Sequence, residues 1–234
     1  MPSIIDMPPT YVTTGLPHAP TALLLDFDGV ILESVELKIQ AFLTIYENET
    51  PEKLAQMLEY QSLHGGITRR VKFQYFEKHL FGRPGDPAEV ERLSATFTRL
   101  VHDAVLACPF VPGAEKFLQS AHDQVDLHVI SGTPQEELVD IIRRRGLSSY
   151  FRSVQGAPET KPEAFARILV QNGYEPARTL AVGDATTEYF AARDLGIPFL
   201  GVVPDGERNP FPARVPIAPS LETLNDLIGL PRSR

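Results

Sequence analysis

Three short apolar runs, each ended by a small polar or acidic residue, constrain the fold more than any other feature of this sequence. They are residues 22–25 before Asp26, residues 125–130 before Ser131, and residues 179–182 before Gly183 and Asp184. Predominantly apolar runs of this length are typical of strands buried on both faces of a parallel sheet. Weaker strands are expected at 153–155 and 198–203. A helical pattern follows each of the three runs, and this alternation predicts a doubly wound parallel α/β sheet with right-handed crossovers.

Proline and glycine mark the ends of the helices expected in this part of the chain. The expected helices are 113–121, 134–145, 162–172 and 187–195. Gly146, Gly173 and Gly196 follow the last three. A glycine just past the last turn is a common way for a helix to end, so these boundaries agree with the strand assignment.

The alternation disappears between Glu33 and Cys108, where the apolar residues recur at helical spacing instead. The simplest description is an all-helical insertion at 34–108, placed inside an α/β core made of 21–33 and 109–234. Residues 1–20 contain five prolines and are expected to form a loose arm.

Composition excludes several classes of protein. The 234 residues include 22 Lys and Arg against 30 Asp and Glu, and a net charge of -8 argues against a surface for nucleic acid or for anionic membrane. The single cysteine, Cys108, excludes an internal disulfide framework and a Cys-rich zinc site. No apolar run approaches the roughly 20 residues of a membrane-spanning helix, and no basic start leads into an apolar stretch. We therefore expect a cytoplasmic protein, either monomer or homodimer.

Two carboxylates follow the first strand, at the sheet edge where open α/β proteins bind their ligands. In the segment Asp26-Phe27-Asp28-Gly29 the acids at i and i+2 can point the same way, and Gly29 permits a tight turn. Two close acids divide into an ionised group and a proton carrier unless a cation lies between them. A polar turn with no catalytic or binding role could contain the same four residues.

Polar residues at the other strand ends and helix starts offer ligands for a phosphate and a metal ion. Ser131 and Gly132 can form an anion cradle or a simple helix cap. Lys161, at a helix start, opposes the helix dipole, which suggests that it serves a nearby anion, although an isolated surface lysine would look the same. Asp184 and Glu188 supply hard oxygen ligands of the kind that Mg²⁺ prefers.

In this order, these features resemble the haloacid dehalogenase superfamily of phosphohydrolases. The signature of that family is a DxD pair, a Ser or Thr after a second strand, a Lys, and a late acidic motif. The resemblance covers residues 23–203, and the helical insertion matches the family's mobile cap. The stretch DFDGVILES followed by a helical cap looks most like the branch that contains phosphoglycolate phosphatase and β-phosphoglucomutase.

The resemblance implies roles for the catalytic residues. Asp26 would attack phosphorus and form an aspartyl-phosphate. Asp28 would protonate the leaving oxygen and then take a proton from water, so its carboxyl should be partly protonated near neutral pH. Ser131, the Gly132 amide and Lys161 would bind the phosphoryl oxygens.

The resemblance also implies a magnesium site. Mg²⁺ would be bound by Asp26, by Asp184 and by the carbonyl of Asp28. The family commonly has Asp where Glu188 stands, so the longer side chain would reach the metal directly or through a water. Dehalogenases lack the second acid of the DxD pair and need no Mg²⁺. Because this sequence has that second acid, Asp28, it argues against a dehalogenase.

Arg69 is the candidate for substrate recognition in the cap. It follows two glycines and Thr68, and this loop is similar to the specificity loop of β-phosphoglucomutase relatives, where an arginine faces the distal end of the substrate. A cation in the first turn of a helix is unfavourable unless it faces a carboxylate or a ligand. A solvated basic face shared with Arg70 and Lys72 is the alternative.

The sequence therefore predicts a Mg²⁺-dependent phosphatase that acts on a small phosphorylated metabolite, such as phosphoglycolate or a sugar phosphate. Two alternatives stay open. A phosphomutase of the β-phosphoglucomutase kind would use the same Asp26 and return the phosphoryl group to the sugar. A non-catalytic binding protein of the same fold would keep the motifs without turnover.

Overall fold

The computed structural model of the chain describes residues 15–231. The first fourteen residues of the expected N-terminal arm lie outside the described residues. Within the described range, no helix is both long enough and apolar enough to cross a membrane.

One sheet of six parallel strands forms the core of the described chain, in the order β3-β2-β1-β4-β5-β6. The strands are β1 (Ala22–Leu25), β2 (Asp126–Pro134), β3 (Ser153–Ala157), β4 (Thr179–Gly183), β5 (Phe199–Val202) and β6 (Ile217–Ala218). The predicted fold class is confirmed. The main differences are that β2 continues to Pro134, so Ser131 and Gly132 lie in the strand and not at a helix start, and that β6 was not predicted. Because β6 has only two residues, it carries no apolar run that a sequence pattern could show.

The register of the central strands aligns the ends that carry polar residues. Leu25, the last residue of β1, is level with Val129 of β2 and with Val182 of β4. The residues that follow these three positions therefore meet at one edge of the sheet, as the sequence predicts.

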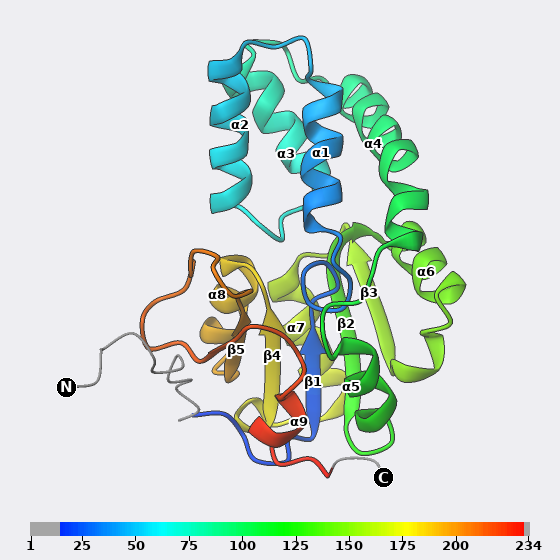
Figure 1. Cartoon of the computed structure of the whole chain (residues 1–234), viewed down its shortest axis with the longest axis vertical. Helices are drawn as coiled ribbons and strands as arrows, with labels where there is room; N and C mark the ends of the chain where they lie inside the picture. The colour runs from blue at the N-terminus through cyan, green and yellow to red at the C-terminus, as the bar shows by residue number, and fades with distance from the viewer. Residues whose placement is uncertain (1–14, 232–234) are drawn as a thin grey trace, which may run out of the picture.

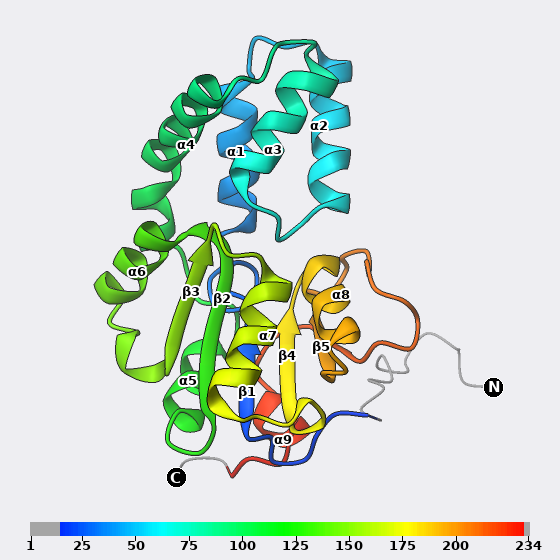
Figure 2. The ribbon, with the colours of Figure 1, turned by 180° about the vertical axis from the view of Figure 1, so that it is seen from behind.

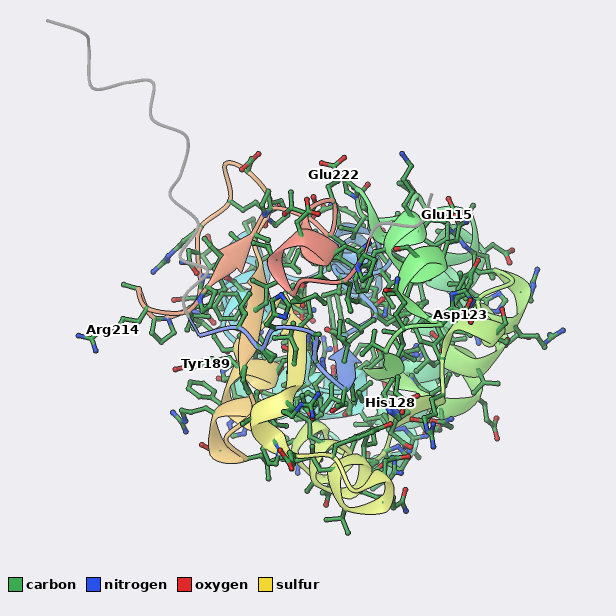
Figure 3. The ribbon with its side chains drawn as sticks, turned by 90° about the horizontal axis from the view of Figure 1, so that it is seen from below. Glu115, Asp123, His128, Tyr189, Arg214 and Glu222 are labelled. Atoms are coloured by element: carbon green, nitrogen blue, oxygen red, sulfur yellow. The ribbon has the colours of Figure 1, made fainter. Side chains whose placement is uncertain are left out.

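Alternate residues of β1 face opposite sides of the sheet, and each side is covered by helices. Leu23 and Leu25 belong to one buried cluster, and Leu24 belongs to the other. Figure 3 shows α5 and α9 on one face and α7 and α8 on the other. The helices of the core are α5 (Ala114–Ala121), α6 (Gln135–Arg144), α7 (Lys161–Asn172), α8 (Thr186–Asp194) and α9 (Leu224–Leu227), with short 3₁₀ turns η2 (Ser148–Tyr150) and η3 (Pro176–Arg178).

The start and end of α7 follow from its sequence and fix the position of Lys161. The carboxylate of Glu163 accepts a hydrogen bond of 2.9 Å from the backbone amide of Thr160, the residue before the helix. Pro162 occupies the first turn, where no intrahelical donor is lost. The helix ends at Gly173, which has a left-handed conformation with φ of 67°. Lys161 is thus held at the first helical position.

The helical insertion lies beyond the carboxyl ends of the strands (Figures 1 and 2). It consists of α1 (Val35–Ile45), α2 (Pro51–Leu63), α3 (Arg69–Tyr75), the π-helical turn η1 (Phe76–Leu80) and α4 (Pro87–Ala107). Buried aromatic rings join these elements. The ring centroid of Phe42 is 5.1 Å from that of Phe73 and 4.6 Å from that of Phe97. The boundaries of the cap at 34 and 108 stay a proposal, which the helical content of this segment supports.

Candidate active site

The turn after β1 brings Asp26 and Asp184 close together. Asp26 is 5% exposed, and its carboxylate accepts a hydrogen bond of 2.8 Å from the Phe27 amide. Gly29 has φ of 76°, and a Cβ atom there would lie 2.5 Å from Oδ2 of Asp184. Both the backbone conformation and the lack of space require glycine at this position.

Asp26, Asp184 and Glu188 form an acidic cluster at the ends of β1 and β4. One carboxylate oxygen from each lies within 4.8 Å of the others. The ammonium of Lys161 is 2.9 Å from Oδ1 of Asp26 and also contacts Glu188. The structure thus brings together four residues that the sequence identified separately.

The charges of this cluster do not balance when all three carboxylates are ionised. Three carboxylates share one ammonium in a site where Glu188 is 1% exposed. Burial and the neighbouring Asp26 raise the pKa of Asp184 to about 8. Burial also raises the pKa of Asp26, although Lys161 opposes this shift. A largely buried set of oxygen ligands with excess negative charge fits a divalent cation.

Asp28 lies in a different environment from Asp26. Its Oδ1 accepts a hydrogen bond of 2.5 Å from Ser34, and its Oδ2 accepts from Ser131 at 3.1 Å and from Thr133 at 3.2 Å. The ammonium of Lys38 is 2.6 Å from the same Oδ2. Burial raises the pKa of Asp28, but Lys38 and the hydroxyl donors outweigh burial and hold this pKa at about 2. The expectation of a partly protonated Asp28 near neutral pH is therefore wrong for this arrangement.

Lys38 and Thr133 are site residues that sequence reasoning missed. Lys38 comes from α1 of the cap and donates a hydrogen bond of 2.8 Å to Oγ1 of Thr133 in the core. Lys38 follows Ser34 by one helical turn, and both side chains contact Asp28. The spacing of Ser34 and Lys38 is the one sequence signal that could have paired them, because residues four apart share a helix face.

A cavity of about 790 Å³ lies between the cap and the ends of the strands. Asp26, Asp28, Gly132 and Asp184 line it on the core side. Its volume is within the range of roughly 300–1,000 Å³ that is usual for small-molecule sites. The candidate residues therefore face a space that can hold a small ligand.

The loop before α3 lines this cavity and contacts the core. The hydroxyl of Thr187 donates a hydrogen bond of 2.9 Å to the carbonyl of Gly65. A Cβ atom at Gly66 would overlap the Thr187 hydroxyl and would lie 2.5 Å from Oε1 of Glu188. A Cβ atom at Gly132 would lie 2.8 Å from the carbonyl of Gly66. Cap backbone thus contacts both the expected phosphate cradle and the acidic cluster.

Arg69 lines the cavity, and its guanidinium has a carboxylate partner from the core. Its Nη2 is 2.5 Å from Oε2 of Glu137 in α6, and Nη1 donates a hydrogen bond of 2.9 Å to Thr98. The guanidinium also lies 4.8 Å from the ring centroid of Phe97. A role of Arg69 in substrate binding stays a prediction.

Comparison with known proteins identifies the family. The model of the haloacid dehalogenase-like hydrolases matches residues 23–202. A phosphoglycolate phosphatase from Synechococcus elongatus is 26% identical over 180 residues, which are 75% of this chain and 80% of that protein.

Many solved structures share the fold. The hydrolase YfnB from Bacillus subtilis, bound to magnesium, superposes with a TM-score of 0.67 at 19% identity. The superposition covers 90% of this chain and 99% of the YfnB chain. CbbY from Rhodobacter sphaeroides, in complex with phosphate, has a TM-score of 0.69 at 19% identity and covers 90% of this chain and 100% of its own. The family match extends over both the α/β core and the helical insertion, and the chain belongs to the haloacid dehalogenase-like hydrolases, as a phosphatase similar to phosphoglycolate phosphatase.

Proposed function

We propose that this protein is a Mg²⁺-dependent phosphatase that hydrolyses a small phosphomonoester through an aspartyl-phosphate. One observation carries the proposal. Asp26, held by Lys161 and the Phe27 amide, lies on the wall of a cavity beside a second carboxylate, Asp28, and an acidic cluster. This set of groups supplies a nucleophile, a base and a cation site within one small space.

Asp26, Asp184 and Glu188 are the residues that would hold the magnesium ion, together with the carbonyl of Asp28. The excess of negative charge among the three side chains supports this assignment, and so does their oxygen-only chemistry. The ion would neutralise charge on the phosphoryl oxygens and keep Asp26 ionised.

In the first half of the reaction, a carboxylate oxygen of Asp26 attacks phosphorus and the bond to the ester oxygen breaks. The product is an aspartyl-phosphate, and the departing alkoxide takes a proton from Asp28, which must first take up that proton from the solvent because its carboxyl is ionised in the free site. Ser131, the Gly132 amide and Lys161 would bind the phosphoryl oxygens, a task in which positioning and charge neutralisation supply most of the rate.

In the second half, water attacks phosphorus and gives its proton to Asp28. The bond between phosphorus and Asp26 breaks, and inorganic phosphate leaves. The pKa of about 2 keeps Asp28 ionised at neutral pH, which is the form that this half of the reaction needs.

The test is release of inorganic phosphate from a panel of about a hundred phosphomonoesters, with Mg²⁺ and with excess chelator. We expect turnover of at least one small phosphomonoester, loss of turnover in chelator, and loss of turnover in the variant Asp26→Asn. Circular dichroism of Asp26→Asn should match that of the unchanged protein.

Three results would contradict the proposal. Turnover by Asp26→Asn at the rate of the unchanged protein would show that Asp26 is not the nucleophile. Isomerised sugar phosphate in place of free phosphate would identify a phosphomutase. Failure to release phosphate from any compound of the panel would favour a binding protein of the same fold.

A further inference from the structure

Gln61 is a buried polar residue of the cap that the reaction proposed above does not use. It lies in the last turn of α2, lines the cavity and is 8% exposed. Among the described residues of the cap that line the cavity, it is the one buried side chain that is both polar and uncharged. Gln61 therefore marks a polar point on the cap side of the cavity.

The amide group of Gln61 lacks a partner within the described chain. Its Nε2 is buried, and no described residue accepts a hydrogen bond from it. Apolar side chains make up much of the cap wall of the cavity: Val35, Ile39, Phe42, Leu58, Ile67 and Phe97. Because a buried amide without a hydrogen bond costs free energy, we expect this donor to have a partner when the cavity is occupied.

The end of α2 that carries Gln61 is the end turned towards the core (Figures 1 and 2). Four residues later, the carbonyl of Gly65 accepts a hydrogen bond of 2.9 Å from Thr187 of the core. Asp26 lines the same cavity from the core side. One ligand in this cavity can therefore contact Asp26 through its phosphoryl group and Gln61 through another group.

The charges around the cavity favour an uncharged ligand group beside Gln61. The basic residues of the cap that line the cavity already have carboxylates near them: Lys38 and Lys72 have Asp28, and Arg69 is paired with Glu137. The exposed carboxylates that also line the cavity are Glu33, Glu36, Asp205, Glu207 and Glu222. These carboxylates disfavour an anion on the part of the ligand that is not at the reaction centre.

A hydroxyl group matches the hydrogen-bonding capacity of the Gln61 amide. The amide donates through Nε2 and accepts through Oε1, and a hydroxyl group also donates and accepts, whereas a carbonyl or an ionised carboxylate only accepts. The terminal torsion of glutamine is broad, so its rotation can turn either atom towards a ligand at little cost. One hydroxyl group can thus satisfy an amide that no described protein group satisfies.

We propose that Gln61 determines specificity by forming a hydrogen bond with a hydroxyl group of the substrate. The substrate class is then a small phosphomonoester of a polyol or a sugar. This inference rests on the phosphatase function proposed above, and it assigns a role to a residue that belongs neither to the sequence motifs nor to the acidic cluster.

The test compares substrates that differ in hydroxyl groups alone. Ribose 5-phosphate is paired with 2-deoxyribose 5-phosphate, glucose 6-phosphate with 2-deoxyglucose 6-phosphate, and glycerol 3-phosphate with propyl phosphate. 2-Phosphoglycolate, which has a carboxylate and no hydroxyl group, represents the competing class. The variants are Gln61→Met, which keeps an unbranched stem, and Gln61→Leu, which repeats the test with a branched side chain. Gln56→Met, at an exposed glutamine of the same helix outside the cavity, is the matched control.

We expect Gln61→Met to raise KM about 3- to 10-fold for the hydroxylated member of at least one pair, because a hydrogen bond between uncharged groups is lost. KM for the other member of that pair and kcat for both should change less than about twofold. The melting temperature of the substrate-free variant should not fall, because the substitution breaks no hydrogen bond of the protein. Gln56→Met should leave KM, kcat and the melting temperature unchanged.

Equal effects of Gln61→Met on both members of every pair would indicate a structural role and overturn the inference. So would hydrolysis of 2-phosphoglycolate at a higher kcat/KM than that of every hydroxylated substrate. Turnover of p-nitrophenyl phosphate without any preference for the hydroxylated members would overturn this inference and leave the phosphatase function standing. Absence of turnover on all substrates, p-nitrophenyl phosphate included, would reject the phosphatase function, and the inference with it.

Discussion

Replacing Gly66 by alanine tests whether the cap loop must close on the acidic cluster for activity. Gly66 has φ of 78°, and the added Cβ atom would overlap the hydroxyl of Thr187 and lie 2.5 Å from Oε1 of Glu188. Gly82 offers a matched control in the same cap. It has φ of 66°, and a Cβ atom there would meet nothing within 4 Å.

Both substitutions place a Cβ atom on a backbone with positive φ, but only the substitution at Gly66 also causes a steric clash. Alanine with positive φ costs about 1–2 kcal/mol at either position. At Gly66 the loop must also move away or displace Glu188 from Lys161. Movement of the loop breaks the 2.9 Å hydrogen bond from Thr187 to the Gly65 carbonyl, worth about 0.5–1.5 kcal/mol. A displacement of about 1 Å at reacting groups can reduce a rate about 100-fold.

We therefore expect Gly66→Ala to lower kcat/KM about 100-fold and the free energy of unfolding by about 2–3 kcal/mol. Gly82→Ala should lower the free energy of unfolding by about 1–2 kcal/mol and leave kcat/KM within twofold. Hydrolysis of p-nitrophenyl phosphate measures the first quantity, and urea unfolding measures the second. If Gly66→Ala keeps more than half of the unchanged kcat/KM, the contact between the cap loop and the cluster is not required for catalysis.

Two further predictions concern charge. Asp184→Asn should raise the melting temperature of the metal-free protein, because it removes an acid whose pKa burial and Asp26 raise to about 8, and it should abolish stabilisation by Mg²⁺. Thermal unfolding in chelator and in Mg²⁺ measures both effects, with Asp205→Asn at the exposed rim as control. A melting temperature in chelator equal to or below that of the unchanged protein would contradict this prediction. Burial lowers the pKa of His128 to about 4 from an ordinary value of about 6.5. As pH falls from 6.5 towards 4, the unfolded chain binds a proton that the folded chain does not, so stability falls by up to about 3 kcal/mol. Urea unfolding from pH 7 to pH 4 should show a shallower decline for His128→Gln, and equal slopes would refute the assignment.

The sequence predicts those features of this site that depend on position along one strand or one helix. Asp26 and Asp184 could be assigned because each directly follows an apolar run, and parallel strands end at a common edge. Lys161 could be placed because Pro162 marks the start of its helix. In each case the local pattern fixes the position of the side chain relative to the sheet.

Features that depend on how the cap packs on the core could not be predicted in the same way. Lys38 contacts Asp28 and Thr133, which is 95 residues further along the chain. Glu137, the partner of Arg69, is 68 residues from it, on a helix of the core. No periodicity within a helix specifies which residues of another domain it meets. The expectation that Asp28 is partly protonated was wrong for this reason. The sequence alone does not show that Lys38 contacts Asp28.

The two acids of the DxD pair receive opposite pKa shifts because different parts of the chain supply their cations. Asp26 shares the ammonium of Lys161, which comes from the core, with Glu188, and burial raises its pKa. Asp28 has the ammonium of Lys38, which comes from the cap, and its pKa is held at about 2. Carboxylates with such divergent environments are suited to different tasks. This difference supports the proposed roles: Asp26, beside the acidic cluster, as the nucleophile, and Asp28, whose charge Lys38 of the cap balances, as the base.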